Sequence, residues 1–298
     1  MNNKKILAFC AASLVAGTAI GAGAMYGIQR KNIKFAKDYS VLPEVIKVLD
    51  DEGINVPDGS DTEKAVVNGY LSLYDDKYTY YYKDEDVELV TEAADENGEV
   101  KYVDNMTTEF KNGNILYTRL HMFDFDTEIV WNSLVDTDIK KAKGFIFDLR
   151  DNGGGSDATA ESIADKFLKK GYCTDHLKNG ETEESRMTDN GKEYDIPVVL
   201  LVNDGTASAA EEFTALMMQN YENLTVIGEK TYGKGIFQDE KVLSNGGTLR
   251  YTNGYYTVGD WECYQDIGIE PDETIEMDKS LIGTFGDTQL KRALEILG

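Results

Sequence analysis

The feature that most constrains the fold is an alternation of apolar strands with amphipathic helices in the second half of the chain. The pattern predicts strands over 115–123, 144–149, 197–202 and 224–227, separated by helices over 127–141, 158–169 and 209–220. The stretches GFIFDL (144–149) and VVLLV (198–202) are apolar on both faces, as strands in the middle of a parallel sheet are. We therefore predict an α/β fold with a mostly parallel central sheet flanked by helices.

Less regular regions precede and follow this core. Apolar spacing predicts a helix over 41–49, and a capping box at Ser60–Glu63 predicts a second helix that ends near Leu73. The acidic span 83–113 has no strong periodicity, so we expect loop or weak strand there.

The C-terminal region is expected to be rich in β-structure. It covers residues 231–264, with turns predicted at Asn245-Gly-Gly and Asn253-Gly. A short final helix is expected from about Thr288.

The first thirty residues are typical of an export signal. Lys4 and Lys5 precede an uncharged run over 6–28, which at ~1.5 Å per residue is just long enough to cross a bilayer. The small-x-small pattern at Ala22-Gly-Ala24 leaves open a cleaved signal peptide beside a retained membrane anchor. We expect an exported, extracytoplasmic protein with a signal or anchor over 1–30, a small helical region and linker over 31–105, and the core over 106–298.

Composition argues against two classes of partner and one kind of site. Lys and Arg number 30 against 54 Asp and Glu, a formal net charge of −24, which disfavours binding to nucleic acids and anionic membrane surfaces. Two histidines, His121 and His176, and no closely spaced ligands predict that the chain has no metal site. Beyond the apolar run, Cys173 and Cys263 are compatible with two buried thiols or with one disulfide.

The stretch GEKTYGKGIFQ, residues 228–238, begins like a nucleotide-binding loop. Such a loop needs Ser or Thr after its lysine and a helix directly behind it. Here Gly235 follows Lys234, and the next residues are typical of a strand, so the sequence argues against a phosphate site. Because side chains alternate along a strand, Lys234 and Gln238 are predicted to point into the same space.

Ser208 lies where an apolar strand is predicted to turn into a helix, at the carboxyl edge of the sheet that favours ligand and catalytic groups. Ser208-Ala-Ala-Glu211 is also a capping box, so a serine that only caps the helix remains an alternative. A nucleophilic serine needs a base, and neither histidine fits: we expect His176 to be exposed in a polar turn and His121 to pack in a strand. Lysine is the known alternative base if burial lowers its pKa.

The stretch DLRDNGGG, residues 148–155, places a glycine turn after a buried strand. Free N–H groups in this turn, together with the N–H of Ala209 at the start of the helix, are suited to bind a tetrahedral oxyanion. A plain turn or a weak phosphate site remains compatible with the same residues.

Three blocks, KGFIFDLRDNGGG, LVNDGTASAAEEF and GEKTYGKGIFQ, together resemble those of the C-terminal processing peptidases, also called tail-specific proteases, in the same order. The resemblance covers roughly residues 46–298 and implies a ClpP/crotonase-like core. It further implies an endopeptidase that cleaves protein or peptide substrates through an acyl-enzyme, with no metal or organic cofactor. By position, Ser208 would be the nucleophile, Lys234 the general base and Gln238 the residue that orients the lysine, with Gly154 and Ala209 as oxyanion-hole donors.

The chain also departs from this family's pattern. Gly153 stands where the family often has proline, and the segment before the strand at 115 is too short for the family's usual PDZ domain. How a substrate would be recognised is therefore open. A non-catalytic peptide- or small-ligand-binding module on the same fold, and a serine-lysine hydrolase of esters or small amides, remain as alternatives.

Overall fold

The computed structural model of the chain describes residues 41–42, 45, 47–48, 59–83, 105–169, 173–178, 181–187, 194–259, 261 and 263–298. The predicted signal or anchor over 6–28 lies outside the described residues. The chain divides into two compact units, Met1–Gly69 and Tyr70–Gly298.

Helical structure is found in the N-terminal region, as the sequence predicts. The helix expected from Ser60 is present as α3, Gly59–Leu71, and the described positions between 41 and 48 are also helical. None of the helices in the described part of the chain is long and apolar enough to span a membrane.

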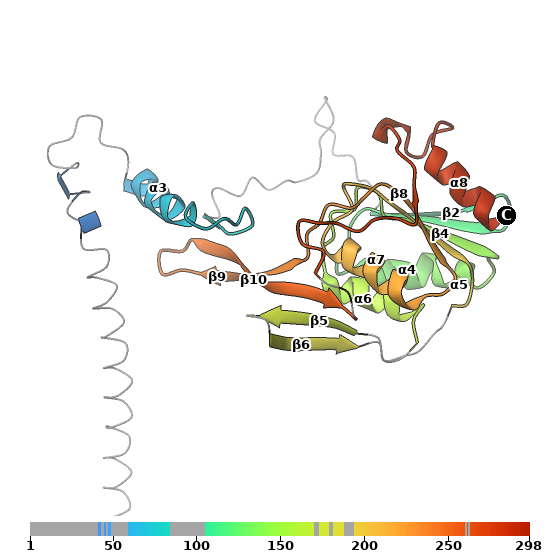
Figure 1. Ribbon diagram of the computed structural model, residues 1–298, viewed down its shortest axis with the longest axis horizontal. Coiled ribbons are helices and arrows are strands. Elements are labelled where there is room, and N and C mark those ends of the chain that lie inside the picture. The colour runs from blue at the N-terminus through green and yellow to red at the C-terminus, as the bar shows by residue number, and fades with distance from the viewer. Residues whose placement is uncertain are drawn as a thin grey trace, which may run out of the picture. The chain divides into compact units, whose positions relative to one another are not determined.

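The second unit is built on a six-stranded sheet in the order β11-β8-β7-β4-β3-β2 (Figure 1). Its strands are β2 (Met106–Lys111), β3 (Ile115–Leu120), β4 (Gly144–Asp148), β7 (Val198–Val202), β8 (Leu224–Gly228) and β11 (Glu273–Thr274). All neighbours pair in parallel except β2 and β3, which are antiparallel. The predicted mostly parallel sheet is confirmed.

Helices cover both faces of this sheet. On one face lie α4 (Thr127–Leu134), α5 (Asp136–Ile139), α6 (Asp157–Asp165) and α7 (Ala209–Asn220), and on the other lies α8 (Thr288–Leu297) (Figure 1). The helix predicted over 127–141 is divided at Val135, and α6 ends before the predicted boundary at 169.

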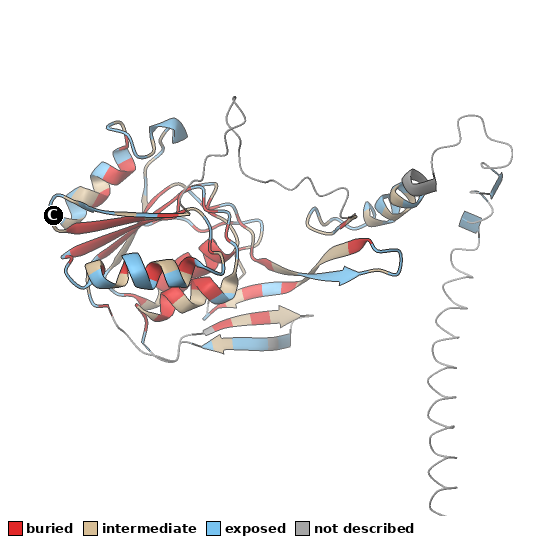
Figure 2. Cartoon of the chain, turned by 180° about the vertical axis from the view of Figure 1, so that it is seen from behind, coloured by how far each residue is buried: buried red, intermediate tan, exposed pale blue. Residues whose placement is uncertain are grey.

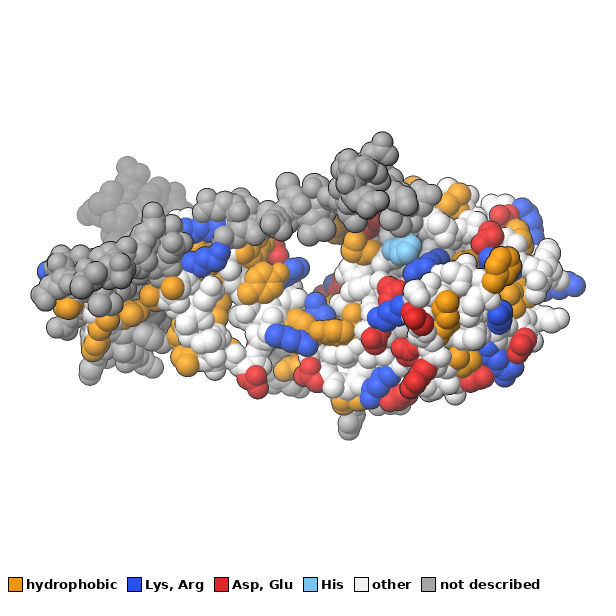
Figure 3. Space-filling view, turned by 90° about the horizontal axis from the view of Figure 1, so that it is seen from above, with side chains coloured by type: hydrophobic (Ala, Val, Ile, Leu, Met, Phe, Trp, Pro, Cys, Tyr) orange, Lys and Arg blue, Asp and Glu red, His pale blue; other side chains and the backbone are white. Residues whose placement is uncertain are grey.

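The double covering explains the continuous apolar runs in the sequence. Phe145 and Phe147 of β4 face the cluster beneath α4, α6 and α7, whereas Ile146 faces the cluster beneath α8. All residues of β4 and β7 are buried, and these strands are red in Figure 2. Figure 3 shows acidic and basic side chains interspersed on the surface of one face of the molecule.

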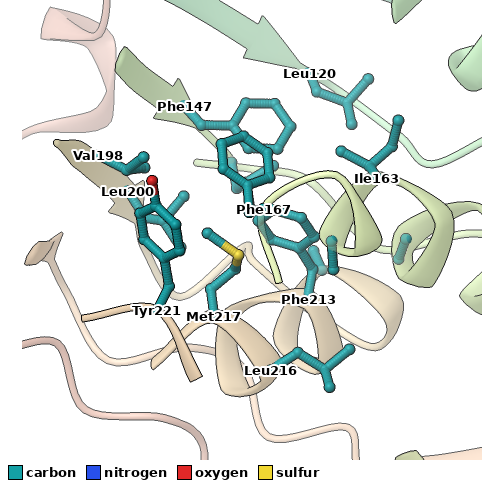
Figure 4. Packing of buried hydrophobic residues seen from close by; sticks show 14 of the residues in the cluster. Leu120, Phe147, Ile163, Phe167, Val198, Leu200, Phe213, Leu216, Met217 and Tyr221 are labelled. Carbon is teal, nitrogen blue, oxygen red and sulfur yellow. The ribbon is translucent and has the colours of Figure 1, made fainter. Parts of the chain in front are cut away.

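Aromatic rings fix α7 against the sheet, as Figure 4 shows for Phe147, Phe167 and Phe213. The ring of Phe213 lies edge-on to that of Phe147, with 5.3 Å between centroids, and 5.7 Å from that of Phe123. Such pairs add to the stabilisation gained by burying apolar area. They fix the position of the helix that Ser208 precedes as its N-cap residue.

A second, antiparallel sheet lies beside the first. Its strands run in the order β1 (Tyr80–Tyr82), β10 (Thr248–Val258), β5 (Cys173–Lys178) and β6 (Glu181–Met187), and β9 (Ile236–Val242) also pairs with β10. The C-terminal region is thus rich in β-structure, as predicted.

One of the two predicted turns in that region is present. The β9–β10 hairpin turns at Asn245, where the N–H of Leu243 donates to the carbonyl of Gly247 at 2.8 Å. The turn predicted at Asn253-Gly254 is wrong: both residues lie inside β10, where the register shifts between Thr252 and Gly254. A glycine within a strand often marks such a bulge.

The prediction of an exposed His176 in a polar turn is also wrong. His176 lies on β5 and is only 4% exposed. Phe237 and Tyr256 pack on its ring, with centroids 5.1 and 4.9 Å away. Residues that are distant in sequence bury this polar strand, and the local composition therefore does not reveal its burial.

Candidate functional site

Ser208 lies between β7 and α7 in an unusual backbone conformation. Its φ is 56° and its ψ is −124°, a region that costs a residue with a side chain of order 1–3 kcal/mol. Neighbouring contacts hold the turn: Ala207 N–H donates to Asn152 O at 2.9 Å, and the Thr206 hydroxyl donates to Leu149 O at 2.8 Å. The strand-to-helix turn predicted from the sequence is therefore sharp and well supported.

The capping box at Ser208 is present, and its hydrogen bond is made by the backbone N–H of Ser208 rather than by the hydroxyl group. The N–H of Ser208 donates to Glu211 Oε2 at 2.9 Å. In the other direction, the N–H of Glu211 donates to the Ser208 carbonyl at 2.8 Å, and the contact between that N–H and the Ser208 hydroxyl falls short of hydrogen-bond geometry. Capping therefore does not require the hydroxyl group of Ser208.

Glu211 joins the serine turn to the lysine segment. Besides the N–H of Ser208, its fully buried carboxylate accepts hydrogen bonds from the N–H groups of Gly233 (2.7 Å) and Lys234 (2.8 Å) and from the Thr231 hydroxyl (2.6 Å). Four donors on one carboxylate fix the two segments relative to each other. The sequence suggested a cap for this residue but gave no sign of the second segment.

The Lys234 amine has a defined hydrogen-bond partner. Its Nζ donates to Gln238 Oε1 at 3.1 Å, and Gln238 Nε2 donates to the carbonyl oxygen of Tyr78. The second bond orients the amide so that its oxygen faces the amine. Lys234 and Gln238 thus share one space, as predicted, although Lys234 lies two residues before β9 begins at Ile236.

The environment of Lys234 disfavours its charged form. Burial is the main cause that lowers the pKa of the Lys234 amine, and the positive charge of Arg250 lowers it further. Weaker influences act in the opposite direction, because the ring of Tyr78, 5.2 Å from Nζ, and the negative charge of Glu211 both favour the ammonium. A lowered pKa makes the neutral amine, which can accept a proton, more abundant at a given pH.

Ser208, Lys234 and Gln238 line the same pocket, a cavity of about 460 Å³. Charged side chains of both signs also line it: Asp157, Glu184 and Asp239, and Arg186 and Arg250. The three residues that the sequence singled out on separate segments therefore meet around one space. A nucleophile, a lysine of lowered pKa and a group that orients this lysine are the components of acyl transfer with a serine-lysine pair.

The glycine turn predicted to form an oxyanion hole lies against Ser208. Gly154 has a φ of 101°, and a Cβ at this position would lie 2.7 Å from Ser208 Cβ and 2.9 Å from Ala209 N. Its N–H is not free, however, because it donates to Asn152 Oδ1 at 2.9 Å. The N–H of Ala209, in the first residue of α7, has no acceptor within its own helix.

A buried ionic network supports the strand that leads into this turn. The Arg150 guanidinium, fully buried, contacts Asp148 at 2.6 Å and Asp287 at 2.9 Å. Gln289 accepts a further hydrogen bond at 3.0 Å, and the Tyr117 hydroxyl donates to Asp148 at 2.7 Å. The sequence drew attention to this stretch for its glycines and gave no sign of the partners in the C-terminal region.

Two other features bear on the sequence predictions. Cys263 carries a free, half-buried thiol, which donates to Gly235 O at 3.3 Å. Of the two alternatives left open by the sequence, a thiol or a disulfide, Cys263 is therefore a thiol. Beside the pocket, Glu161, His176 and Glu212 bring potential ligand atoms within 4.8 Å of one another. Spacing along the sequence gave no indication of this cluster.

Comparisons of the sequence with a family profile and with known proteins agree on one family. The sequence profile of peptidase family S41 matches residues 114–275. The carboxy-terminal processing protease CtpA of Bacillus subtilis is 34% identical over 178 residues, which are 59% of this chain and 38% of that protein. The chain thus matches little more than a third of the length of this curated relative.

Solved structures share the fold. The photosystem II D1 C-terminal processing protease has a TM-score of 0.55 at 23% identity, covering 67% of this chain and 54% of that chain. A lipoprotein from Streptococcus agalactiae has a TM-score of 0.60 at 18% identity, covering 85% of this chain and 87% of that chain. At these identities the likeness concerns the fold alone.

Proposed function

This chain belongs to peptidase family S41, a family of serine peptidases, and from that premise we propose that it is a serine endopeptidase with Ser208 as nucleophile and Lys234 as general base. Gln238 orients the lysine amine. The observation that carries the proposal is that Ser208, Lys234 and Gln238 line one pocket. In this pocket the Lys234 amine donates a hydrogen bond to Gln238, and burial lowers the pKa of the amine.

Acylation would proceed in two steps. The neutral Lys234 amine takes the proton of the Ser208 hydroxyl while Oγ bonds to the carbonyl carbon of the scissile peptide, whose oxygen becomes an oxyanion. When this intermediate collapses, the C–N bond breaks and the Lys234 ammonium returns its proton to the leaving amine. The acyl group remains on Ser208 as an ester.

Deacylation repeats the same proton transfers with water as the nucleophile. Lys234 takes a proton from the water, whose oxygen bonds to the ester carbonyl, and then gives the proton back to Ser208 Oγ as the C–O bond breaks. The Ala209 N–H is the more available donor to the oxyanion, because the Gly154 N–H already donates to Asn152 and would have to share that bond.

The test is peptidase activity of the full-length protein, purified in mild detergent, on a protein substrate such as casein and on a panel of peptides. Ser208→Ala is expected to abolish turnover. Lys234→Ala should lower kcat by about 10²–10⁴-fold, the usual contribution of general acid–base catalysis. Lys230→Ala is the matched control, because Lys230 is an exposed lysine paired with Glu270 at 3.0 Å.

Wild-type rates in Lys234→Ala would contradict the assignment of the base. His176 also lines the pocket, so His176→Gln is made in parallel. Within the described residues its Nε2 has no hydrogen-bond partner, Ser208 included, and we therefore expect it not to act as the base. A greater loss of kcat in His176→Gln than in Lys234→Ala would assign the general base to His176 instead of Lys234.

Two rival functions are separated by the same experiment. A binding module on this fold would show equally low turnover for wild type and Ser208→Ala on every substrate. A hydrolase of esters or small amides would turn over nitrophenyl esters in a Ser208-dependent way and leave the peptides intact.

We also propose that the protein is exported, with residues 6–28 as a retained anchor or a cleaved signal. The apolar run after Lys4 and Lys5 supports this proposal. Expression of the chain in a bacterial host, followed by fractionation and N-terminal sequencing, tests it. Recovery of the intact protein from the soluble cytoplasmic fraction would contradict it.

A further inference from the structure

Beside the catalytic pocket, three elements bring acidic and imidazole side chains together in the interior. Glu161 comes from α6, Glu212 from α7 and His176 from β5, and their ligand atoms lie within 4.8 Å of one another. Glu212 is fully buried, and His176 is 4% exposed. The cluster therefore lies where the helices of the α/β core meet the antiparallel sheet.

Several polar atoms of this cluster have no hydrogen-bond partner. Within the described residues, both carboxylate oxygens of Glu212, Oε1 of Glu161 and Nε2 of His176 are buried without a hydrogen bond. The hydroxyl of Thr174 is likewise buried without a hydrogen bond. A buried unsatisfied polar group usually costs about 1–3 kcal/mol, so several around one point indicate a ligand that they bind together.

The charges around the cluster are also unbalanced. The Arg186 guanidinium contacts Asp157 at 2.8 Å and Glu161 at 3.5 Å, and it is the cation that faces this cluster in the described part of the chain. When Glu212 is ionised, three carboxylates, Asp157, Glu161 and Glu212, thus share one positive charge. A divalent cation would neutralise the excess.

The geometry points to a binding site for a divalent transition-metal cation of the zinc type, held by His176 Nε2 and by the carboxylates of Glu161 and Glu212. One imidazole and two carboxylates suit zinc, with water or Asp157 in the fourth position. His176 Nε2 lies 4.0 Å from Glu161 Oε1, whereas zinc bonds of ~2.0–2.1 Å in a tetrahedron require roughly 3.4 Å. Binding would therefore have to bring these two atoms about 0.6 Å closer together.

A bound cation would join α6 and α7 to β5. His176 forms part of the wall of the pocket that contains Ser208, so the cation would stiffen that wall without contacting the reacting atoms. Phe237 and Tyr256 already fix the plane of the imidazole. The inference does not depend on the proposed peptidase function.

The alternative is a proton shared between the two glutamates. Burial, and then the negative charge of Glu161, raises the pKa of the Glu212 carboxyl well above its usual range, so without a cation this group holds a proton. Glu212→Gln resembles the protonated form and is therefore expected to fold.

The experiment measures zinc binding to full-length Ser208→Ala protein in detergent, treated with a chelator and then desalted. Isothermal titration with zinc chloride is expected to give one ion per chain, and metal analysis after a second desalting should find it retained. Calcium and magnesium chloride should give no binding at the same site, because these ions prefer oxygen ligands. Zinc should also raise the Tm.

Glu212→Gln and, separately, His176→Gln in the same background identify the ligands. Each should weaken zinc binding by more than the 10–100-fold typical of losing an outer-shell partner. His121→Gln is the matched control, since it removes the other histidine of the chain and should leave zinc affinity unchanged.

Less than one retained zinc ion per chain would overturn the inference, and so would equal affinity in the wild-type site and in Glu212→Gln. Binding lost equally in His121→Gln would place the zinc elsewhere. Because all measurements use a chain without its nucleophile, a failure here is distinct from a failure of the peptidase proposal.

Discussion

Lys234 is the residue on which the proposed chemistry most depends, because lysine accepts a proton only when neutral. Burial lowers the pKa of its amine, and the charge of Arg250 adds to this effect. The two causes differ in how they can be altered. Burial is built into the pocket, whereas the charge of Arg250, a partly exposed residue, can be removed by a single substitution. The pH dependence of catalysis is therefore adjustable.

Arg250→Gln should move the rise of kcat/KM to higher pH. The neutral fraction of Lys234 increases as pH rises through its pKa, and removing the nearby positive charge makes the ammonium form easier to keep, so the pKa increases. Profiles of kcat/KM from neutral to strongly alkaline pH measure the shift. Lys241→Gln, an exposed charge on the same hairpin outside the pocket, should shift the profile less; an unchanged profile in Arg250→Gln would contradict this prediction.

At the scale of elements, the N-terminus of α7 and the segment before β9 are linked by one carboxylate. Glu211→Gln replaces an acceptor oxygen by an amide nitrogen, which cannot accept from backbone N–H groups. We expect the free energy of unfolding to fall by about 2–4 kcal/mol, and kcat to fall because Ser208 and Lys234 are no longer fixed together. Urea unfolding and steady-state kinetics measure both.

The matched control for Glu211→Gln is Glu222→Gln, at an exposed position just after α7. It should change stability by less than about 0.5 kcal/mol. Equal stability of the two variants would show that the four hydrogen bonds to Glu211 do not join the segments.

Arg150 links the carboxyl end of β4 to the N-cap residue of α8, Asp287. Arg150→Met would leave two buried carboxylates without their partner, and breaking a buried pair in this way costs roughly 3–5 kcal/mol. Arg292→Met is the control, because Arg292 pairs with Glu273 at the surface of α8 and such pairs contribute about 0–1 kcal/mol. Chemical denaturation measures both, and a loss in Arg150→Met as small as that in the control would contradict the prediction.

The elements predicted from the sequence are those whose burial follows from local pattern. The strands β4 and β7 are buried on both faces and read as unbroken apolar runs, and α7 follows directly from its capping box. The β5–β6 hairpin was missed because its buried residues, including Thr174 and His176, are polar and are covered by residues distant in sequence.

In the site, too, the features with a local sequence pattern could be predicted and those that depend on distant residues could not. Ser208, Lys234 and Gln238 could be singled out because a sharp turn and a strand each leave a local signature. The bond from the Gly154 N–H to Asn152 and the pairing of Arg150 with Asp287 depend on side-chain conformation and on contacts across 137 residues. Neither leaves a periodic pattern, so sequence alone could not supply them.

For the whole molecule, the sign of the charge is the property that most affects how substrates arrive. The chain carries a formal net charge of −24, yet the pocket itself is lined by acidic and basic groups alike: Asp157, Glu184 and Asp239 against Arg186, Lys234 and Arg250. Contacts inside the pocket therefore give little preference between basic and acidic peptides. Any preference must come from the long-range field, which acts on association.

Peptides that differ only in flanking residues test this expectation. At low ionic strength, a substrate flanked by lysines should have a kcat/KM about tenfold or more above one flanked by glutamates, because the acidic surface attracts the first and repels the second. The Debye length falls from about 30 Å at 0.01 M salt to about 3 Å at 1 M, so the ratio should approach one at high salt while kcat stays unchanged. A ratio that is insensitive to salt would instead locate the preference in the pocket, and Asp239→Asn, which removes an exposed carboxylate of its lining, would then lower it.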